Sequence, residues 1–169
     1  MDFTGRAWMK EYGPETNFRM PPQPGPRKWQ DSTWQQWWDP NSQWGGVHRI
    51  GHEYNVAEGE MIAGWSNLIT PKGVLKHVTW LPMREDDRLE RGWASGDGHS
   101  RNEYIDGAHV WFIDDREHDI QAELRFIDYH APFCGFPSSG KTAEEISSDH
   151  IDVAGPITRW VRVEGETIQ

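Results

Sequence analysis

Residues 60–81, E-M-I-A-G-W-S-N-L-I-T-P-K-G-V-L-K-H-V-T-W-L, contain two apolar segments separated by a turn sequence. The segments Glu60–Ile69 and Val74–Leu81 are rich in aromatic, aliphatic and β-branched residues, and T-P-K-G connects them. Such residues favour strands, and a short turn containing Pro and Gly is typical of an antiparallel hairpin. The stretch therefore predicts a hairpin within an antiparallel sheet.

Similar short apolar runs, separated by turn residues, continue along the chain from Thr33. Many short strands at such spacing are typical of an antiparallel barrel or sandwich. Helix is indicated only for Lys141–His150, by a capping box, while Met83–Gly92 reads as a single turn or a charged loop. We predict an all-β fold, a calycin- or lipocalin-like antiparallel barrel or curled β-sandwich with one short helix. The other expected strands are Trp34–Trp38, Gly46–His52, Ala108–Asp114, Ile120–His130 and Ile157–Glu164.

Composition limits the class of protein. The 169 residues suit one domain, and we expect residues 32–169 to form it, with residues 1–31 as an arm packed over it. The 17 Lys and Arg against 27 Asp and Glu give a net charge of −10, which argues against a nucleic-acid-binding surface. The single cysteine, Cys134, excludes a disulfide framework and a cysteine-rich zinc site. With no membrane-length apolar run and no secretory signal pattern, we expect a cytoplasmic protein.

Tryptophan is the dominant large residue, since 11 Trp exceed the 5 Leu of the chain. Each large aromatic side chain buries roughly 150–250 Å², so the tryptophans either fill a solid core or wall an apolar cavity. In the cavity alternative, aromatic side chains on the expected strands bind the substrate. These residues are Trp38, Trp65, Trp80, Trp111, Phe112 and Phe126.

Ionisable residues end several of the expected strand faces. Alternation places Asp128 and His130 at the end of the apolar face of Ile120–His130, about 6–7 Å apart at the rise of a strand. A carboxylate among aromatic groups has a raised pKa and can act as a general acid, whereas the alternative leaves both groups in solvent. The candidate catalytic residues are Asp128, His130, His48, His52 and Asp114.

Two further motifs are predicted to be without function. His48 and His52 are accompanied by Glu58 and Glu60, but four residues of strand separate the histidines by about 13 Å, too far to bind one metal ion. We therefore predict no metal site. Residues 135–142, G-F-P-S-S-G-K-T, match the P-loop pattern literally, yet Pro137 interrupts the loop and no buried strand directly precedes it. We predict no nucleotide binding.

Two stretches carry a family resemblance. Residues 44–61, W-G-G-V-H-R-I-G-H-E-Y-N-V-A-E-G-E-M, and residues 150–166, H-I-D-V-A-G-P-I-T-R-W-V-R-V-E-G-E, resemble the first lobe of a two-lobed lipocalin-like family. This family includes hydroxyneurosporene synthase (carotenoid 1,2-hydratase) and tocopherol-cyclase-like proteins. The resemblance covers residues 34–82 and 105–166. It implies a calycin-like fold, an apolar and often isoprenoid substrate, and water addition, water removal or cyclisation through protonation.

The chain differs from that family because it stops at Gln169, where relatives continue into a second lobe. This implies either that a separate subunit supplies the other lobe or that a lone lobe binds without catalysis. The last expected strand, Ile157–Glu164, would then form an open sheet edge. We accordingly expect a stable oligomer, hetero-oligomeric or with a second copy of the chain, whose interface involves this strand or the N-terminal arm.

Three functional hypotheses follow. The first is a subunit of a cofactor-independent hydratase, dehydratase or isomerase that acts on an apolar, terpenoid-like alcohol or alkene. One of the candidate acids would protonate the substrate, and indole faces would stabilise the resulting cation. The second hypothesis is a lipocalin-like carrier of a hydrophobic small molecule, and the third is a structural subunit of a hetero-oligomer.

The rejected P-loop gives a direct test. We expect Lys141→Ala to leave the melting temperature nearly unchanged, and ATP to stabilise neither the wild type nor the variant. Thermal unfolding with increasing ATP measures both effects. Saturable protection by ATP that is lost in Lys141→Ala would show that the motif binds nucleotide after all.

Overall fold

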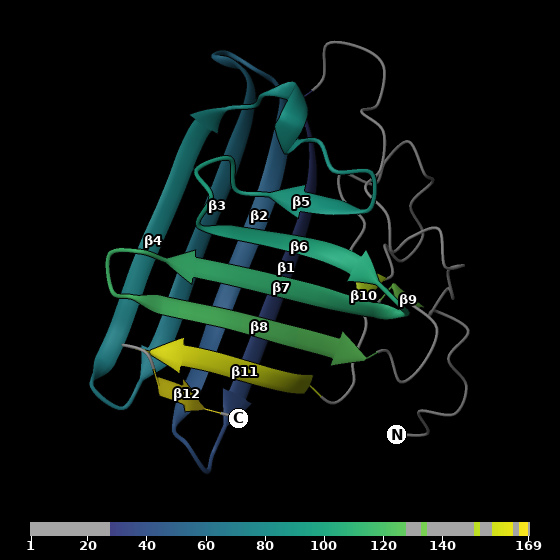
Figure 1. Cartoon of the computed structure of the whole chain (residues 1–169). Helices are drawn as coiled ribbons and strands as arrows, with labels where there is room; N and C mark the ends of the chain where they lie inside the picture. The colour runs from purple at the N-terminus through teal and green to yellow at the C-terminus, as the bar shows by residue number, and fades with distance from the viewer. Residues whose placement is uncertain (1–27, 128–132, 135–150, 153–156, 164–165, 169) are drawn as a thin grey trace, which may run out of the picture.

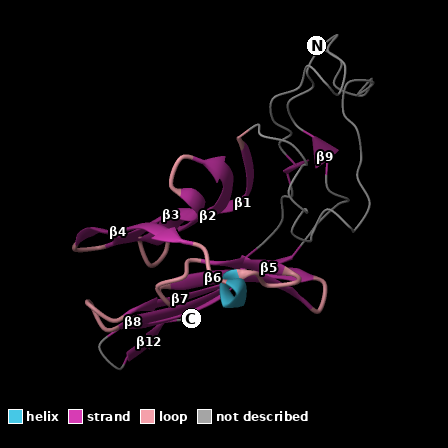
Figure 2. Ribbon diagram, turned by 90° about the horizontal axis from the view of Figure 1, so that it is seen from above, coloured by secondary structure: helices cyan, strands magenta, loops and turns pink. Residues whose placement is uncertain are grey.

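The computed structural model describes residues 28–127, 133–134, 151–152, 157–163 and 166–168. In this part of the chain, antiparallel strands form two main sheets that face one another as an open, curled sandwich (Figures 1 and 2). The predicted all-β class is thereby confirmed. The helix expected at residues 141–150 lies outside the described residues, and the turn expected within residues 83–92 is a 3-10 turn, Glu85–Asp87.

The first sheet is a meander of four strands in the order β1-β2-β3-β4. Its third and fourth strands form the predicted hairpin, with Thr70 opposite Gly73 across a two-residue turn. Gly73 has a φ of 136°, a conformation that residues with a Cβ rarely adopt. The strands are β1 (Trp29–Asp39), β2 (Trp44–Val56), β3 (Gly59–Thr70) and β4 (Gly73–Pro82).

The second sheet has six strands in the order β12-β11-β8-β7-β6-β5. In Figure 1 its strands lie in front of the first sheet and cross the strands of that sheet steeply. A separate pair is formed by β9 (Phe133–Cys134) and β10 (Ile151–Asp152). The six strands are β5 (Gly92–Ala94), β6 (Ser100–Ile105), β7 (Ala108–Asp115), β8 (Ile120–Ile127), β11 (Ile157–Val163) and β12 (Glu166–Ile168).

Three details differ from the sequence-based expectations. Strand β1 begins at Trp29, so its first residues belong to the sheet rather than to the expected arm. Strands β5, β6 and β12 had no expected counterpart. The prediction that Ile157–Glu164 forms an open sheet edge is wrong for its C-terminal part, because β11 pairs with β8 along its length and β12 pairs with residues 161–163 on the other side.

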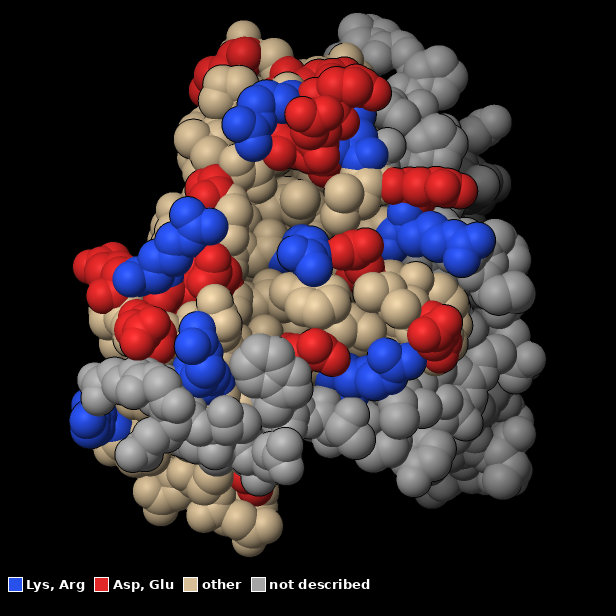
Figure 3. Space-filling model, viewed as in Figure 1, with Lys and Arg blue, Asp and Glu red and all other residues tan. Residues whose placement is uncertain are grey.

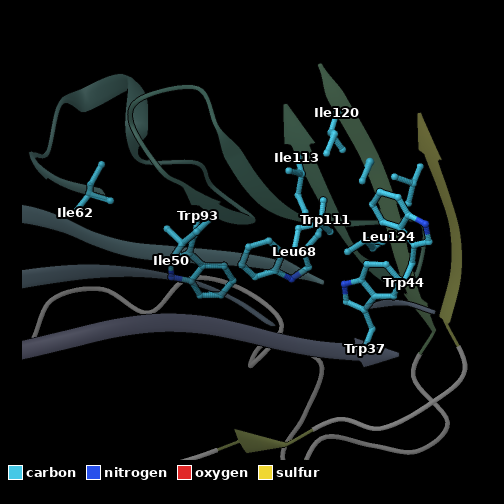
Figure 4. Close-up of a cluster of buried hydrophobic side chains, with 12 residues drawn as sticks. Trp37, Trp44, Ile50, Ile62, Leu68, Trp93, Trp111, Ile113, Ile120 and Leu124 are labelled. Carbon is cyan, nitrogen blue, oxygen red and sulfur yellow. The ribbon is translucent and has the colours of Figure 1, made fainter. Parts of the chain in front are cut away.

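Tryptophans from both sheets fill the space between them (Figure 4). The first sheet contributes Trp37 and Trp44, and the second contributes Trp93 and Trp111, all of them buried. Aliphatic side chains such as Leu124 complete the cluster. For these four tryptophans, the solid-core alternative is confirmed.

A pair of glycines opposite a pair of tryptophans makes this core possible. The β1–β2 register places Trp37 opposite Gly46 and Trp38 opposite Gly45. A Cβ at Gly46 would lie 2.7 Å from Nε1 of Trp37, and one at Gly45 would overlap the ring of Trp38. Each glycine therefore leaves room for one indole, one inside the sandwich and one outside it.

We expect Gly46→Ala to lower the free energy of unfolding by about 1–3 kcal/mol, the usual cost of overpacking a core. Urea unfolding measures the change, and Gln36→Ala on the exposed side of β1 is the control, with an expected change within about 0.5 kcal/mol. Since alanine is otherwise better than glycine in a strand by roughly 0.5–1 kcal/mol, an unchanged or raised stability would contradict the role given to Gly46.

Candidate functional site

A row of polar side chains crosses the inner face of the first sheet. The register aligns Gln35, His48, Ser66 and His77 on successive strands from β1 to β4. The first three side chains are buried, and His77 at the β4 edge is partly exposed. The row therefore leads from the core to the rim of the sandwich.

His48 is a fully buried imidazole with both ring nitrogens hydrogen-bonded. Trp37 Nε1 donates to its Nε2 at 3.0 Å, so Nδ1 carries the proton and donates to Ser66 Oγ at 2.8 Å. Its ring centroid lies 5.6 Å from that of Trp111 in the opposite sheet. Burial, with a smaller contribution from His99, lowers the pKa of His48 from 6.5 to about 3. His48 is therefore neutral at pH 7, and its geometry suits joining the sheets rather than proton transfer to a substrate.

The other predicted acid–base residues lie apart from His48. His52 is buried further along β2, and its Nε2 lies 3.4 Å from the carbonyl oxygen of Ala94. Asp114 lies on the outer face of the second sheet and accepts hydrogen bonds from Arg116 at 2.9 Å and Gln121 at 3.3 Å. Asp128 and His130 lie outside the described residues. The structure thus places His48, His52 and Asp114 in three separate environments.

The six aromatic residues expected to bind substrate lie on three different surfaces. Phe112 is on the outer face of the second sheet, beneath the guanidinium of Arg101, which is 4.1 Å from the ring centroid. Two of the others, Trp111 and Phe126, project from the inner face of that sheet. The remaining three lie on the outer face of the first sheet: Trp38, Trp65 and Trp80. These side chains do not surround one pocket in the described structure.

A different cluster, centred on Asp97, lies where the β5–β6 loop meets β4. The carboxylate accepts hydrogen bonds from the hydroxyl groups of Ser95 and Thr79, both at 2.6 Å, and from the backbone N–H of His99 at 2.9 Å. A fourth hydrogen bond comes from Nε2 of His77 at 2.7 Å. Burial alone would raise the pKa of Asp97, but these donors outweigh it and hold the pKa well below the usual range. Asp97 is therefore a fixed negative charge.

Two histidines stack beside this charge. The rings of His77 and His99 have centroids 3.8 Å apart and are nearly parallel, at 7°. His99 is buried, and its Nε2 has no hydrogen-bond partner among the described residues. Burial, followed by the proximity of His77, lowers the pKa of His99, so this ring is neutral at pH 7 and can accept a proton.

His99 lines a pocket of about 380 Å³. Arg84 and Arg101 contribute basic groups to its wall, and Phe112 contributes an aromatic ring. Three acidic residues also line it: Asp86, Asp87 and Asp114. Figure 3 shows basic and acidic side chains interspersed on the outer face of the second sheet. No cluster of three or more metal-binding side chains occurs within the described residues. The pocket therefore offers charged and aromatic groups to a polar or partly polar ligand, while the Nε2 atom of His99 itself is buried.

Sequence reasoning singled out Asp114 and Phe112 of this pocket but missed Asp97, His77 and His99. The local signal is S-G-D-G-H-S at residues 95–100, in which glycines flank an aspartate. Gly96 and Gly98 have φ values of 78° and 83°, which allow the sharp turns that aim the carboxylate at β4.

Comparison with known proteins gives one match. A family described as "Domain of unknown function (DUF7064)" matches residues 13–169. Neither the curated proteins nor the solved structures contain a significant match. The resemblance to carotenoid hydratase and tocopherol cyclase therefore stays a prediction. In the described part of the chain, no helix has the length and apolar character needed to cross a bilayer.

We expect stability to fall as the pH decreases from 6.5 towards 4, because folded His48 does not accept the proton that the unfolded chain binds. Its pKa is about 3 in the fold against 6.5 ordinarily, so the unfolded state carries more protons in this interval. At pH 5 this amounts to about 2 kcal/mol, and above pH 6.5 the effect of His48 vanishes.

Urea unfolding at a series of pH values measures this dependence. His109, whose pKa burial lowers to about 4, contributes with the same sign, so the comparison with His48→Gln isolates the share of His48. An identical pH dependence in wild type and His48→Gln would show that the assignment is wrong.

Proposed function

The chain belongs to the DUF7064 family, and from the geometry of its pocket we propose that it is a cofactor-independent acid–base enzyme, a hydro-lyase or isomerase. The observation that carries this proposal is the neutral imidazole of His99 at the pocket wall, stacked on His77 beside the fixed charge of Asp97. The substrate class is an alcohol or an alkene bound in the pocket that His99 lines.

A neutral imidazole whose pKa lies below the ambient pH can act as a general base. Proton uptake gives His99 a positive charge. Three carboxylates stabilise this charge by electrostatic attraction: Asp115, Asp97 and Asp114. In the dehydration direction, His99 removes a proton from carbon, and the C–H electron pair forms the double bond as the C–O bond breaks. The hydroxide that leaves with the C–O electron pair takes the proton from His99 to become water.

The pocket walls restrict how a substrate can lie. Arg84 is oriented by Asp87 and by the carbonyl oxygen of Gly96, to which it donates at 2.7 Å. Arg101 is held between Glu103 and the face of Phe112. Oriented guanidinium groups of this kind favour oxygen atoms, while Phe112 favours an apolar skeleton. We therefore infer a substrate with an apolar skeleton and at least one oxygen substituent.

The family resemblance supports an isoprenoid skeleton, and the single cysteine fits a reducing compartment. A terpenoid-like alcohol and a cytoplasmic location are therefore part of the same proposal. The hydrophobic-ligand carrier is the alternative function, and the experiment below separates the two.

The test measures deuterium incorporation from D₂O into a panel of terpene alcohols, their alkenes and smaller hydroxylated compounds by mass spectrometry. We expect the wild type to label at least one compound and His99→Gln to reduce the rate about 100-fold or more, as loss of a general base does. His109→Gln is the matched control, because His109 is another histidine whose pKa is lowered by burial and it is not part of the pocket wall. Arg101→Gln, at a partly exposed side chain, tests the pocket independently if His99→Gln unfolds.

The pH dependence gives a second readout. Because the pKa of His99 is lowered from 6.5, the labelling rate should be constant above that value and decline only at more acidic pH. Equal rates in wild type and His99→Gln would contradict the proposal. Saturable quenching of tryptophan fluorescence by a terpene alcohol, with no label at any pH, would contradict it in favour of the carrier.

A further inference from the structure

The outer face of the first sheet is apolar although nothing in the described structure covers it. The register of β1 to β4 places 20 side chains there, in five cross-strand rows of four. Among the described residues, five of the six large hydrophobic side chains that are most exposed belong to this face. They are Trp34 at 51%, Trp38 at 53%, Val74 at 51%, Val78 at 77% and Trp80 at 48%.

The outer face of the second sheet shows what a solvated surface of this protein is like. Its strands present alternating acidic and basic side chains, as Figure 3 shows. They include Arg101, Glu103, Asp114, Glu123 and Arg125. On the outer face of the first sheet, by contrast, the one acidic residue is Glu53, which is buried and lies within 3.3 Å of Arg49 and 3.7 Å of Lys28. This depletion of acidic residues, together with abundant tryptophan, is typical of the core of a protein interface.

Side chains on this face are already fixed in place. The ring of Trp38 lies over Gly45, and the guanidinium of Arg49 lies over Gly51. Arg49 also donates to the carbonyl oxygen of Ala63 at 2.9 Å. Binding loses less conformational entropy when the contacting side chains are already ordered. The face is therefore suited to dock as a rigid surface.

We propose that a second copy of this chain stacks on this face, around a two-fold axis parallel to the strands between β2 and β3. Such an axis exchanges β1 with β4 and β2 with β3, and it leaves each cross-strand row in register with itself. Trp34 shares a row with Val78, and Trp38 shares a row with Val74. The exposed indoles of Trp34 and Trp38 therefore each meet an exposed isopropyl group of the other copy, whereas Trp80, which shares a row with Ser32, meets that serine.

At the centre of the face, the same two-fold axis also pairs residues of complementary chemistry. Arg49 and Trp65 are cross-strand partners on β2 and β3, so the axis brings the Arg49 position of each copy opposite the Trp65 position of the other. A cation over an indole face is a favourable contact, and Trp and Arg are the residues that most often dominate interface energies. Lys76 meets the partner's Gln36 rather than a second lysine. The arrangement is that of two sheets in aligned face-to-face packing.

The area of this face and the net charge of the chain both support a second copy as its binding partner. In the row of Gln30, Glu53, Met61 and Pro82 the two central side chains are already buried. Four strands about 4.8 Å apart and the other four rows about 6.7 Å apart give a face of roughly 500 Å², or about 1,000 Å² for the pair, which is the lower limit for a specific interface. With a net charge of −10, two copies repel one another in most orientations. Contact through a face with no exposed acidic side chain avoids placing acidic groups against each other. This interface is distinct from the terminal segments suggested by the sequence, and it does not depend on the proposed activity.

The test is the mass of the full-length protein in solution. Sedimentation equilibrium should give twice 19.6 kDa for the wild type. Val78→Lys should weaken dimerisation about 100-fold or more, because it buries an unpaired charge against an indole. Asn41→Lys adds the same charge in the exposed β1–β2 turn and should leave the dimer intact. Circular dichroism checks that each variant folds, which is expected because both positions are exposed.

A charge exchange tests the geometry itself. Trp34→Glu alone and Val78→Lys alone should each give monomers, whereas mixing the two variants should restore a heterodimer through a new Glu–Lys pair. A monomeric wild type overturns the proposal and leaves the face to a different partner. A wild-type dimer that Val78→Lys does not weaken overturns it as well, and failure of the mixed pair to associate overturns the two-fold arrangement.

Discussion

The hydrogen bond from Trp37 to His48 is the interaction on which the core depends. It joins β1 to β2, and the second ring nitrogen of His48 extends the connection to Ser66 on β3. The tilted ring contact with Trp111 then reaches the opposite sheet. One imidazole thus links three adjacent strands of one sheet to a tryptophan of the other, and it can do so only while it is neutral. Gly46 provides the space in which this contact is made.

The same inner face positions the candidate site. His77 lies in the cross-strand row of His48 and Ser66, so the register that fixes the core also fixes where His77 meets the β5–β6 loop. Asp97 then receives donors from both sheets, since Thr79 and His77 are on β4 while Ser95 and His99 are on the loop. The site is therefore a junction between the sheets at the rim of the sandwich, where a buried histidine lines a pocket.

Local sequence signals account for the strands that are long or joined by short turns. The T-P-K-G turn and the apolar alternation around it specify the β3–β4 hairpin, which the structure confirms. The short strands β5 and β6 were missed because their few apolar residues are separated by S-G-D-G-H-S, which resembles an ordinary loop. The contact between His77 and Asp97 joins residues 20 positions apart on different sheets, and no periodicity along one strand reports such a contact. Adjacent tryptophans such as Trp37 and Trp38 pose a similar problem, because alternation sends them to opposite faces without indicating which face is internal.

The first sheet is apolar on both faces, and this property connects the candidate site to the outer surface. Along β4, His77 and Thr79 point inward to Asp97, while Val78 and Trp80 alternate with them and point outward. A sheet with apolar residues on both faces is typical of one that is covered on both sides. Whatever covers Val78 and Trp80 restricts the motion of the same strand that supplies two of the four donors to Asp97. β4 is an edge strand that pairs only with β3 in the described structure. Cover on its outer face would therefore stabilise β4 more than it would stabilise the inner strands of the sheet. Association through the outer face and precise geometry at the inner site thus both depend on strand β4.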